Sequence, residues 1–256
     1  MKRISLVVLA FCTCFTSMAW AQKPTCKHSP FWAEFHKQNM QRWNRCENVL
    51  KVHNVGNLRL KWSTPIVGGD NAAPAVADGL VYVGGPNLHA LDARTGAKVW
   101  ELCCGGDYRV DSSPAVANRV VYVGALGGKV FALDASTGVL LWSYPTSGAV
   151  WSSPAVANGV VYVGSDDHNV YALDAKTGAK LWSYDTGDRV FSSPAVANGV
   201  VYVGSFDNNV YALDASTGVK LWGHAFLNSG QYGSPSVVNG VLYFAPPKGT
   251  FAFGLK

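Results

Sequence analysis

Two adjacent cysteines, Cys103 and Cys104, are the most chemically distinctive residues of this sequence. If they are oxidised together, the resulting disulfide closes a small ring that distorts the intervening peptide. Because it closes no loop of chain, it contributes no loop entropy and is a poor structural staple. The pair therefore does little to stabilise the fold and is a candidate functional feature.

A second set of candidate residues lies in the segments that precede a recurring Ser-Pro-Ala-Val motif. Three positions before each recurring proline, the residues all differ: Asn71, Asp111, Trp151, Phe191 and Tyr232. Two positions earlier stand Gly69, Arg109, Ala149, Arg189 and Gly230. Positions that vary within a constant motif are candidates for binding, and their chemistry fits a planar or anionic ligand or an extended peptide. The alternative is that these side chains fill a narrow central channel.

Other catalytic and metal-binding patterns are absent from the sequence. The six histidines are scattered, and no Ser-His-Asp spacing or phosphate-binding loop is present. Asp166 to Asn169 and Asp207 to Asn209 are similar to metal-ligating runs, but Asp and Asn are also favoured in hairpin loops. We therefore predict no catalytic residue and no metal site, and we expect no nucleic-acid binding.

An internal repeat defines the elements that must position these residues. The recurring prolines are Pro74, Pro114, Pro154, Pro194 and Pro235, with spacings of 40, 40, 40 and 41 residues. A period near 40 with about four strand-sized pieces predicts an all-β fold, a β-propeller in which each repeat is one four-stranded blade. Residues 57–256 then form five blades.

The third repeat illustrates the pattern of one blade. After Pro154 comes a short strand, and Asn158-Gly159 predicts a tight type I′ hairpin. Val160 to Gly164 predicts the second strand, Val170 to Leu173 the third, and Lys180 to Tyr184 the fourth. The turn between the last two is Asp174 to Gly178, where an Asp side chain caps the turn and a glycine closes it.

The repeated sequence of each blade resembles the pyrroloquinoline quinone (PQQ) enzyme repeat. This repeat occurs in quinoprotein alcohol dehydrogenases and in the propeller lipoproteins that assemble outer-membrane barrels. In that family a Trp after the Asp-Ala-x-Thr-Gly turn docks between neighbouring blades. The matching residues here are Trp100, Trp142, Trp182 and Trp222. The resemblance covers residues 57–256, and it indicates the fold more strongly than any reaction.

The same resemblance implies a possible cofactor site. In quinoprotein alcohol dehydrogenases a vicinal disulfide lies against the quinone, and Cys103-Cys104 looks similar. We expect no bound cofactor, because the family's catalytic aspartate and calcium-ligand motifs are not found; PQQ with calcium is the alternative that the resemblance implies. The residues that would contact it are Cys103, Cys104, Arg109, Asp111, Trp151, Arg189, Phe191 and Tyr232.

The two ends of the repeat array are complementary. Trp62 begins the array as a lone fourth strand, whereas Thr250 to Phe253 matches a third strand with no Trp strand after it. We therefore predict a monomeric ring closed by pairing of the first strand with the last blade. The alternatives are a ring completed by a second chain and a fragment of a larger propeller, because the resembled family has larger rings.

The residues before the repeats predict export. Residues 1–21 have a charged start, an apolar run and a small-x-small site ending at Ala21, which predicts a cleaved signal peptide; lipidation at Cys12 is the alternative. Residues 22–56 form a leader, which a Cys26–Cys46 disulfide would staple in an oxidising compartment. Residues 22–61 carry a net charge of +6 and residues 62–256 a net charge of −3, so the basic surplus belongs to the leader.

These observations predict a periplasmic or secreted bacterial propeller without a transmembrane helix. Our first hypothesis is a binding or scaffold module for a protein or polysaccharide partner in the envelope. The alternative is a reduced quinoprotein that binds PQQ, with dehydrogenase activity as a further possibility.

Overall fold

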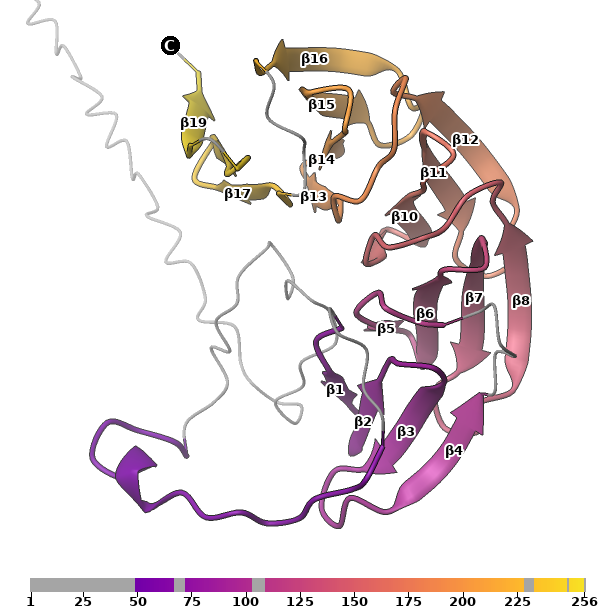
Figure 1. Cartoon of the computed structure of the whole chain (residues 1–256), viewed down its shortest axis with the longest axis vertical. Helices are drawn as coiled ribbons and strands as arrows, with labels where there is room; N and C mark the ends of the chain where they lie inside the picture. Colours follow the sequence, from indigo (N-terminus) through magenta and orange to yellow (C-terminus); the bar gives the residue numbers. More distant parts are fainter. Residues whose placement is uncertain (1–48, 67–71, 103–108, 228–232, 248, 256) are drawn as a thin grey trace, which may run out of the picture.

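The computed structural model describes residues 49–66, 72–102, 109–227, 233–247 and 249–255. It contains five antiparallel sheets, four with four strands and one with three. Figure 1 shows the sheets following one another around an arc, with the first strand of each sheet inside and the last outside. The predicted all-β propeller architecture is confirmed. The signal peptide, Cys26–Cys46, Cys103, Cys104 and Tyr232 lie outside the described residues.

The strands have the following bounds. Blade 1 comprises β1 (Ala75–Ala77), β2 (Leu80–Val83), β3 (Leu88–Asp92) and β4 (Lys98–Leu102). Blade 2 comprises β5 (Ala115–Ala117), β6 (Val120–Ala125), β7 (Lys129–Asp134) and β8 (Leu140–Pro145). Blade 3 comprises β9 (Ala155–Ala157), β10 (Val160–Gly164), β11 (Asn169–Asp174) and β12 (Lys180–Asp185). Blade 4 comprises β13 (Ala195–Ala197), β14 (Val200–Gly204), β15 (Asn209–Asp214) and β16 (Lys220–Ala225). Blade 5 comprises β17 (Ser236–Val238), β18 (Val241–Phe244) and β19 (Phe251–Gly254).

A 3₁₀ turn, η1 (Val55–Asn57), precedes the blades. Within the described ranges, no helix is long and apolar enough to cross a membrane.

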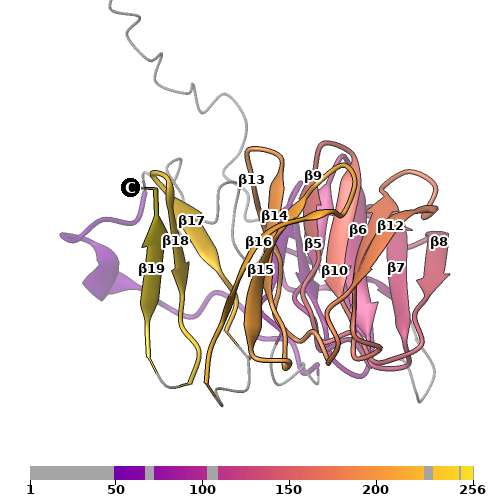
Figure 2. The ribbon, with the colours of Figure 1, turned by 90° about the horizontal axis from the view of Figure 1, so that it is seen from above.

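The strands run up and down between two faces of the arc (Figure 2). One face, which we call the turn face, carries the hairpins between the first and second strands and the turns between the third and fourth. The other, the loop face, carries the loops between the second and third strands and the connections from one blade to the next. The variable residues before each proline therefore belong to the loop face.

The local predictions for the third blade agree with the structure. β10 spans the predicted residues, and β11 and β12 are one or two residues longer than expected. Asn158 and Gly159 have φ angles of 51° and 77°, as a type I′ hairpin requires. Asp174 Oδ1 accepts hydrogen bonds from the backbone N–H groups of Lys176 and Thr177 at 3.0 and 2.8 Å, so its side chain caps the turn.

Three of the four repeated tryptophans dock on a turn of the next blade, as the resemblance implied. The indole Nε1 of Trp100, Trp142 and Trp182 donates to the carbonyl of Ala135, Ala175 and Ala215, respectively, at 2.9, 3.0 and 3.0 Å. A glycine of the same turn faces each ring, and a Cβ on Gly138 would lie 2.6 Å from the Trp100 indole. The turn must therefore carry glycine both for its positive φ and for room.

The hydrophobic core is divided among the junctions between blades. The junctions of blades 2 and 3 and of blades 3 and 4 pack residues of the second, third and fourth strands of one blade against the second and third strands of the next. The innermost strands of successive blades lie side by side. The junction between blades 4 and 5 buries fewer residues, with Val210, Phe226, Leu242 and Phe244 as its buried members. The core thus becomes smaller toward blade 5.

The predicted closure of the ring differs from the structure. Trp62 docks on blade 1 as a fourth-strand tryptophan would, with Nε1 donating to Ala93 O at 3.1 Å. However, residues 57–66 form no strand, and the described part of blade 5 contains only β17, β18 and β19. The sheets of blades 1 and 5 stand at opposite ends of the arc (Figure 1), so the segment that holds Trp62 does not pair with β19.

The first testable prediction compares two tryptophans at the same repeat position. Trp182 is 7% exposed and docked on blade 4, whereas Trp222 is 38% exposed and packs on Phe253. We expect Trp182→Ala to lower the free energy of unfolding by about 3–5 kcal/mol and Trp222→Ala by about 1–2 kcal/mol. Urea unfolding followed by circular dichroism measures both, and equal losses would contradict the docking argument.

The second prediction concerns acid stability. Hydrogen bonds from Ser216 and Thr217 lower the pKa of Asp214 from 3.8 to about 2. Because the folded-state pKa is depressed, this carboxylate contributes stability above about pH 4 that is lost as the pH falls toward 2. Hydrogen bonds from Ser136 and Thr137 likewise lower the pKa of Asp134 to about 2. Asp214→Asn should therefore flatten the fall of the urea midpoint over that range, and adding Asp134→Asn should flatten it further. A variant with the wild-type slope would refute the assignment.

Candidate functional site

A chain of serines positions the loop-face residues. Successive repeats are joined by hydrogen bonds from the backbone N–H of Ser113, Ser153 and Ser193 to the side-chain oxygens of Ser153, Ser193 and Ser234, at 2.9, 2.9 and 3.0 Å. Most of these serines are buried, so the bonds are formed away from water. The segments before β5, β9 and β13 are therefore held in register with one another, and only their side chains vary.

Four side chains from blades 3 and 4 gather on this face, and we call them the aromatic–arginine cluster: Trp151, Arg189, Phe191 and Phe206. The rings of Trp151 and Phe191 have centroids 5.7 Å apart, across the junction between the blades. Phe191 and Phe206 meet edge to face at 4.7 Å. The Arg189 guanidinium lies 5.6 and 5.1 Å from the centroids of the Phe191 and Phe206 rings. Its side chain is 52% exposed, so a charged group is presented to solvent between aromatic rings.

Asp166 adds a carboxylate to the cluster. Burial raises the pKa of Asp166, while the charge of Arg189 and a hydrogen bond from the Trp151 side chain act in the opposite direction. Oδ1 of this carboxylate is buried and has no hydrogen-bond partner within the described residues. Asp166 therefore links Trp151 of its own blade to Arg189 of the next.

Two other predicted residues pair with each other. Arg109 Nε donates to Asp111 Oδ1 at 2.7 Å, and Asp111 is only 4% exposed. The buried carboxylate thus has a charged partner, as buried charges require. Asp111 is thus held by an ion pair within its own loop.

The structure therefore divides the predicted site. It brings together Trp151, Arg189 and Phe191, and it pairs Arg109 with Asp111 on blade 2. The sequence analysis missed Phe206 and considered Asp166 only as part of an Asp-rich hairpin loop; both residues lie in loops between the second and third strands. These positions also vary between blades, with Leu126 at the matching place in blade 2. The comparison of repeats that identified Trp151 would have found them had it been applied to this loop.

The Asp-rich loops are structural in this fold. Asp167 accepts hydrogen bonds from the Ser147 N–H at 2.8 Å and from the Tyr171 hydroxyl at 2.8 Å, which tie its loop to the connection from blade 2 and to β11. In the part of the chain that the structure describes, no group of three His, Cys, Asp or Glu side chains is placed to hold a metal ion.

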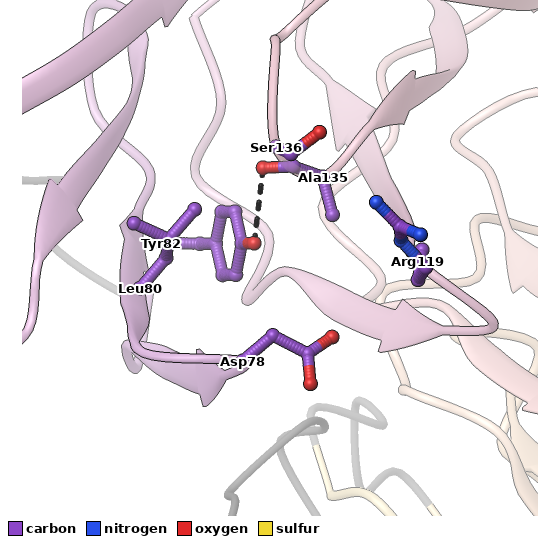
Figure 3. A pocket seen from close by; sticks show the side chains of 6 residues that line it. All are labelled: Asp78, Leu80, Tyr82, Arg119, Ala135 and Ser136. Atoms are coloured by element: carbon purple, nitrogen blue, oxygen red, sulfur yellow. Dashed lines mark hydrogen bonds between the residues drawn. The ribbon is translucent and has the colours of Figure 1, made fainter.

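A cavity of about 450 Å³ opens on the turn face, between blades 1 and 2. Figure 3 shows its six lining residues: Asp78, Leu80, Tyr82, Arg119, Ala135 and Ser136. The Tyr82 hydroxyl donates to Ala135 O at 3.1 Å, and burial with nearby carboxylates raises the Tyr82 pKa to about 12. This tyrosine therefore remains a neutral hydrogen-bond donor and forms a fixed wall of the cavity.

The two charged residues of this cavity depart from the repeat. The matching hairpins of blades 3, 4 and 5 are all Asn-Gly, whereas blade 1 has Asp78-Gly79 and blade 2 has Asn118-Arg119. Arg119 has a φ of 63°, and the other non-glycine residues with positive φ among those described are Asn, Asp or His. An arginine in this conformation costs about 1 kcal/mol relative to glycine. The sequence analysis did not single out either residue.

Curated relatives match a part of this chain. A quinohemoprotein alcohol dehydrogenase, ADH-IIG, from Pseudomonas putida is 37% identical over 122 residues, which are 41% of this chain and 16% of that protein. The quinohemoprotein alcohol dehydrogenase of Comamonas testosteroni is 36% identical over 122 residues, with the same coverage. The matched region is thus a small part of these enzymes.

Solved structures share the fold over more of the chain. The Pseudomonas putida quinohemoprotein alcohol dehydrogenase has a TM-score of 0.69 at 25% identity, covering 88% of this chain and 46% of that one. BamB from Moraxella catarrhalis has a TM-score of 0.60 at 23% identity, covering 73% of this chain and 58% of that one. The chain therefore spans about half the length of these structures.

A family model described as outer membrane protein assembly factor BamB matches residues 44–102 and 84–244. These two matches include all of blades 1 to 4 and β17 and β18 of blade 5. Since they cover well over half of the sequence, this chain belongs to the family of the outer membrane protein assembly factor BamB.

Proposed function

We propose that this protein is an exported propeller that binds a protein partner in the bacterial envelope through its aromatic–arginine cluster. One observation carries the proposal: Arg189 stands half exposed between the rings of Phe191 and Phe206, with Trp151 beside them. Arginine and aromatic side chains are the residue types that contribute most to protein interfaces. The serine hydrogen bonds hold the cluster in place, which reduces the entropy lost on binding.

Two further observations support this proposal. The family to which the chain belongs is named for an assembly factor of outer membrane proteins, which is a role for a binding protein. The first 21 residues have the pattern of a signal peptide, which would place the protein in the envelope or outside the cell. The similarity to quinohemoprotein dehydrogenases supports the shared fold but not a shared reaction, because one fold can carry many functions.

Site-specific photocrosslinking tests the proposal. A benzoylphenylalanine at Phe191 should yield a defined protein adduct in intact cells of the source bacterium, and the same group at Leu181 should not. Leu181 is 53% exposed on the outer strand of blade 3, so it is a matched accessible control away from the cluster. Arg189→Ala or Trp151→Ala should reduce the adduct about tenfold. Equal adducts at both positions, or an adduct indifferent to both substitutions, would refute the interface.

The second candidate function is quinone binding, favoured by the similarity of residues in this chain to quinohemoprotein alcohol dehydrogenases. Cys103-Cys104 and the rings of Trp151 and Phe191 would supply the contacts, since planar ligands stack on aromatic rings. Within the described residues we identify no calcium site that would accompany the quinone.

A titration of the mature protein with PQQ, with and without calcium, separates the two functions. If the protein is a binding module, tryptophan fluorescence should not change saturably and no dye should be reduced with simple alcohols. Saturable quenching at micromolar PQQ that weakens in Trp151→Ala and Cys103→Ser would instead assign the quinone function. Loss of quenching in Trp151→Ala must be checked by circular dichroism, so that unfolding is not mistaken for loss of a ligand contact.

A further inference from the structure

The junction between blades 1 and 2, where the turn-face cavity lies, differs from the next two junctions in charge but shares a hydrogen bond with them. At each of the first three junctions a tyrosine hydroxyl donates to the alanine carbonyl of the next blade: Tyr82 to Ala135 at 3.1 Å, Tyr122 to Ala175 at 3.1 Å and Tyr162 to Ala215 at 3.0 Å. The hydrogen bond that Tyr82 makes beside the cavity is therefore a repeated structural feature. What is particular to the first junction is the pair of hairpins that form its walls.

Those hairpins place opposite charges on the two blades. Asp78 replaces the asparagine of the other hairpins, and Arg119 replaces a glycine. At the junction between blades 3 and 4 the corresponding residues are Asn158 and Gly199, and the serine that matches Ser136 is Ser216. The first junction thus has a carboxylate facing the cavity from blade 1 and a guanidinium facing it from blade 2, where the third has two neutral residues (Figure 3).

Neither charge is used to hold the fold together within the described residues. No hydrogen bond or ion pair joins the Asp78 carboxylate or the Arg119 guanidinium to another group there, and both residues are exposed. Arg119 also occupies a backbone conformation that glycine adopts without strain. Strained residues in a pocket, retained without a stabilising contact, suggest a role in binding.

From this geometry we infer that the cavity binds a small zwitterion of the amino-acid or short-peptide class. Its ammonium group would face Asp78 and its carboxylate would face Arg119, whose planar fork matches a carboxylate with two parallel hydrogen bonds. Leu80 and the ring of Tyr82 provide an apolar wall for the ligand's side chain. A volume of about 450 Å³ lies within the range of small-molecule sites. This inference is independent of the partner proposed for the loop face.

Isothermal titration of the mature protein with glycyl-L-leucine tests the inference. We expect one saturable site per chain, with affinity in the range of about 0.1–5 mM because both charges remain partly solvated. N-acetylglycyl-L-leucine lacks the ammonium group and glycyl-L-leucinamide lacks the carboxylate, and each should bind at least about tenfold more weakly. Absence of saturable binding of the free dipeptide up to about 20 mM would overturn the proposal.

Two substitutions assign the charges. Asp78→Asn and Arg119→Gly restore the residues found in the other blades, so both should fold, and Arg119→Gly should unfold at an equal or higher temperature because it relieves the positive φ. Each should weaken dipeptide binding about tenfold or more. In addition, Asp78→Asn should leave the binding of N-acetylglycyl-L-leucine unchanged, because that probe has no ammonium group to lose.

The third junction provides the matched control. Asn158→Asp together with Gly199→Arg transplants the two charges, and we expect the number of dipeptide sites per chain to rise from one to two. Near-ultraviolet circular dichroism verifies that the arginine is accommodated. Binding that is unaffected by Asp78→Asn and Arg119→Gly would place the dipeptide elsewhere and refute the assignment to this cavity.

Discussion

The docking of one tryptophan on the turn of the next blade is the interaction on which the rest of this structure depends. In each of three junctions the indole N–H and the tyrosine hydroxyl donate to the same alanine carbonyl, while a glycine leaves room for the ring. A blade with neighbours on both sides must therefore carry a tryptophan that docks on the next blade and a turn that accepts the tryptophan of the preceding blade. This requirement explains why the framework is nearly identical from repeat to repeat. It also explains the exposure of Trp222, which packs on Phe253 and reaches no such turn within the described residues.

Because the framework is fixed by these contacts, variation is confined to the two faces of the arc. On the loop face the serine hydrogen bonds hold the backbone, and the variable side chains of blades 3 and 4 form the aromatic–arginine cluster. On the turn face, Asp78 and Arg119 stand in the hairpins of blades 1 and 2 at positions where blades 3, 4 and 5 have neutral residues. The two sites differ in chemistry, since one presents a cation among aromatic rings and the other presents both charges beside an apolar wall. A repeat protein can thus vary the residues on its two faces without changing its core.

The strands, hairpins and capped turns of the blades could be predicted from the sequence because they depend on residues close together in the chain. Asn158-Gly159 adopts its hairpin wherever the flanking strands form, and Asp174 caps a turn only two and three residues away. The tryptophan contacts could be predicted through the family resemblance, since they recur at each junction. The candidate site was found in part. Trp151, Arg189 and Phe191 converge, but Phe206 was not singled out and Asp166 was assigned to a hairpin loop.

The sequence by itself determined the blade, its four strands and the positions free to vary, because a 40-residue period repeats every local requirement. Only the tertiary structure decided which of the variable residues meet. Arg109 pairs with Asp111 within one blade, whereas Arg189 lies against Phe206 and Asp166 of two different blades. Asp78 and Arg119 are 41 residues apart and face one cavity because their blades pack side by side. Closure of the ring likewise could not be predicted from the sequence. It depends on the sum of the rotations between successive blades, and the packing at each junction sets each rotation.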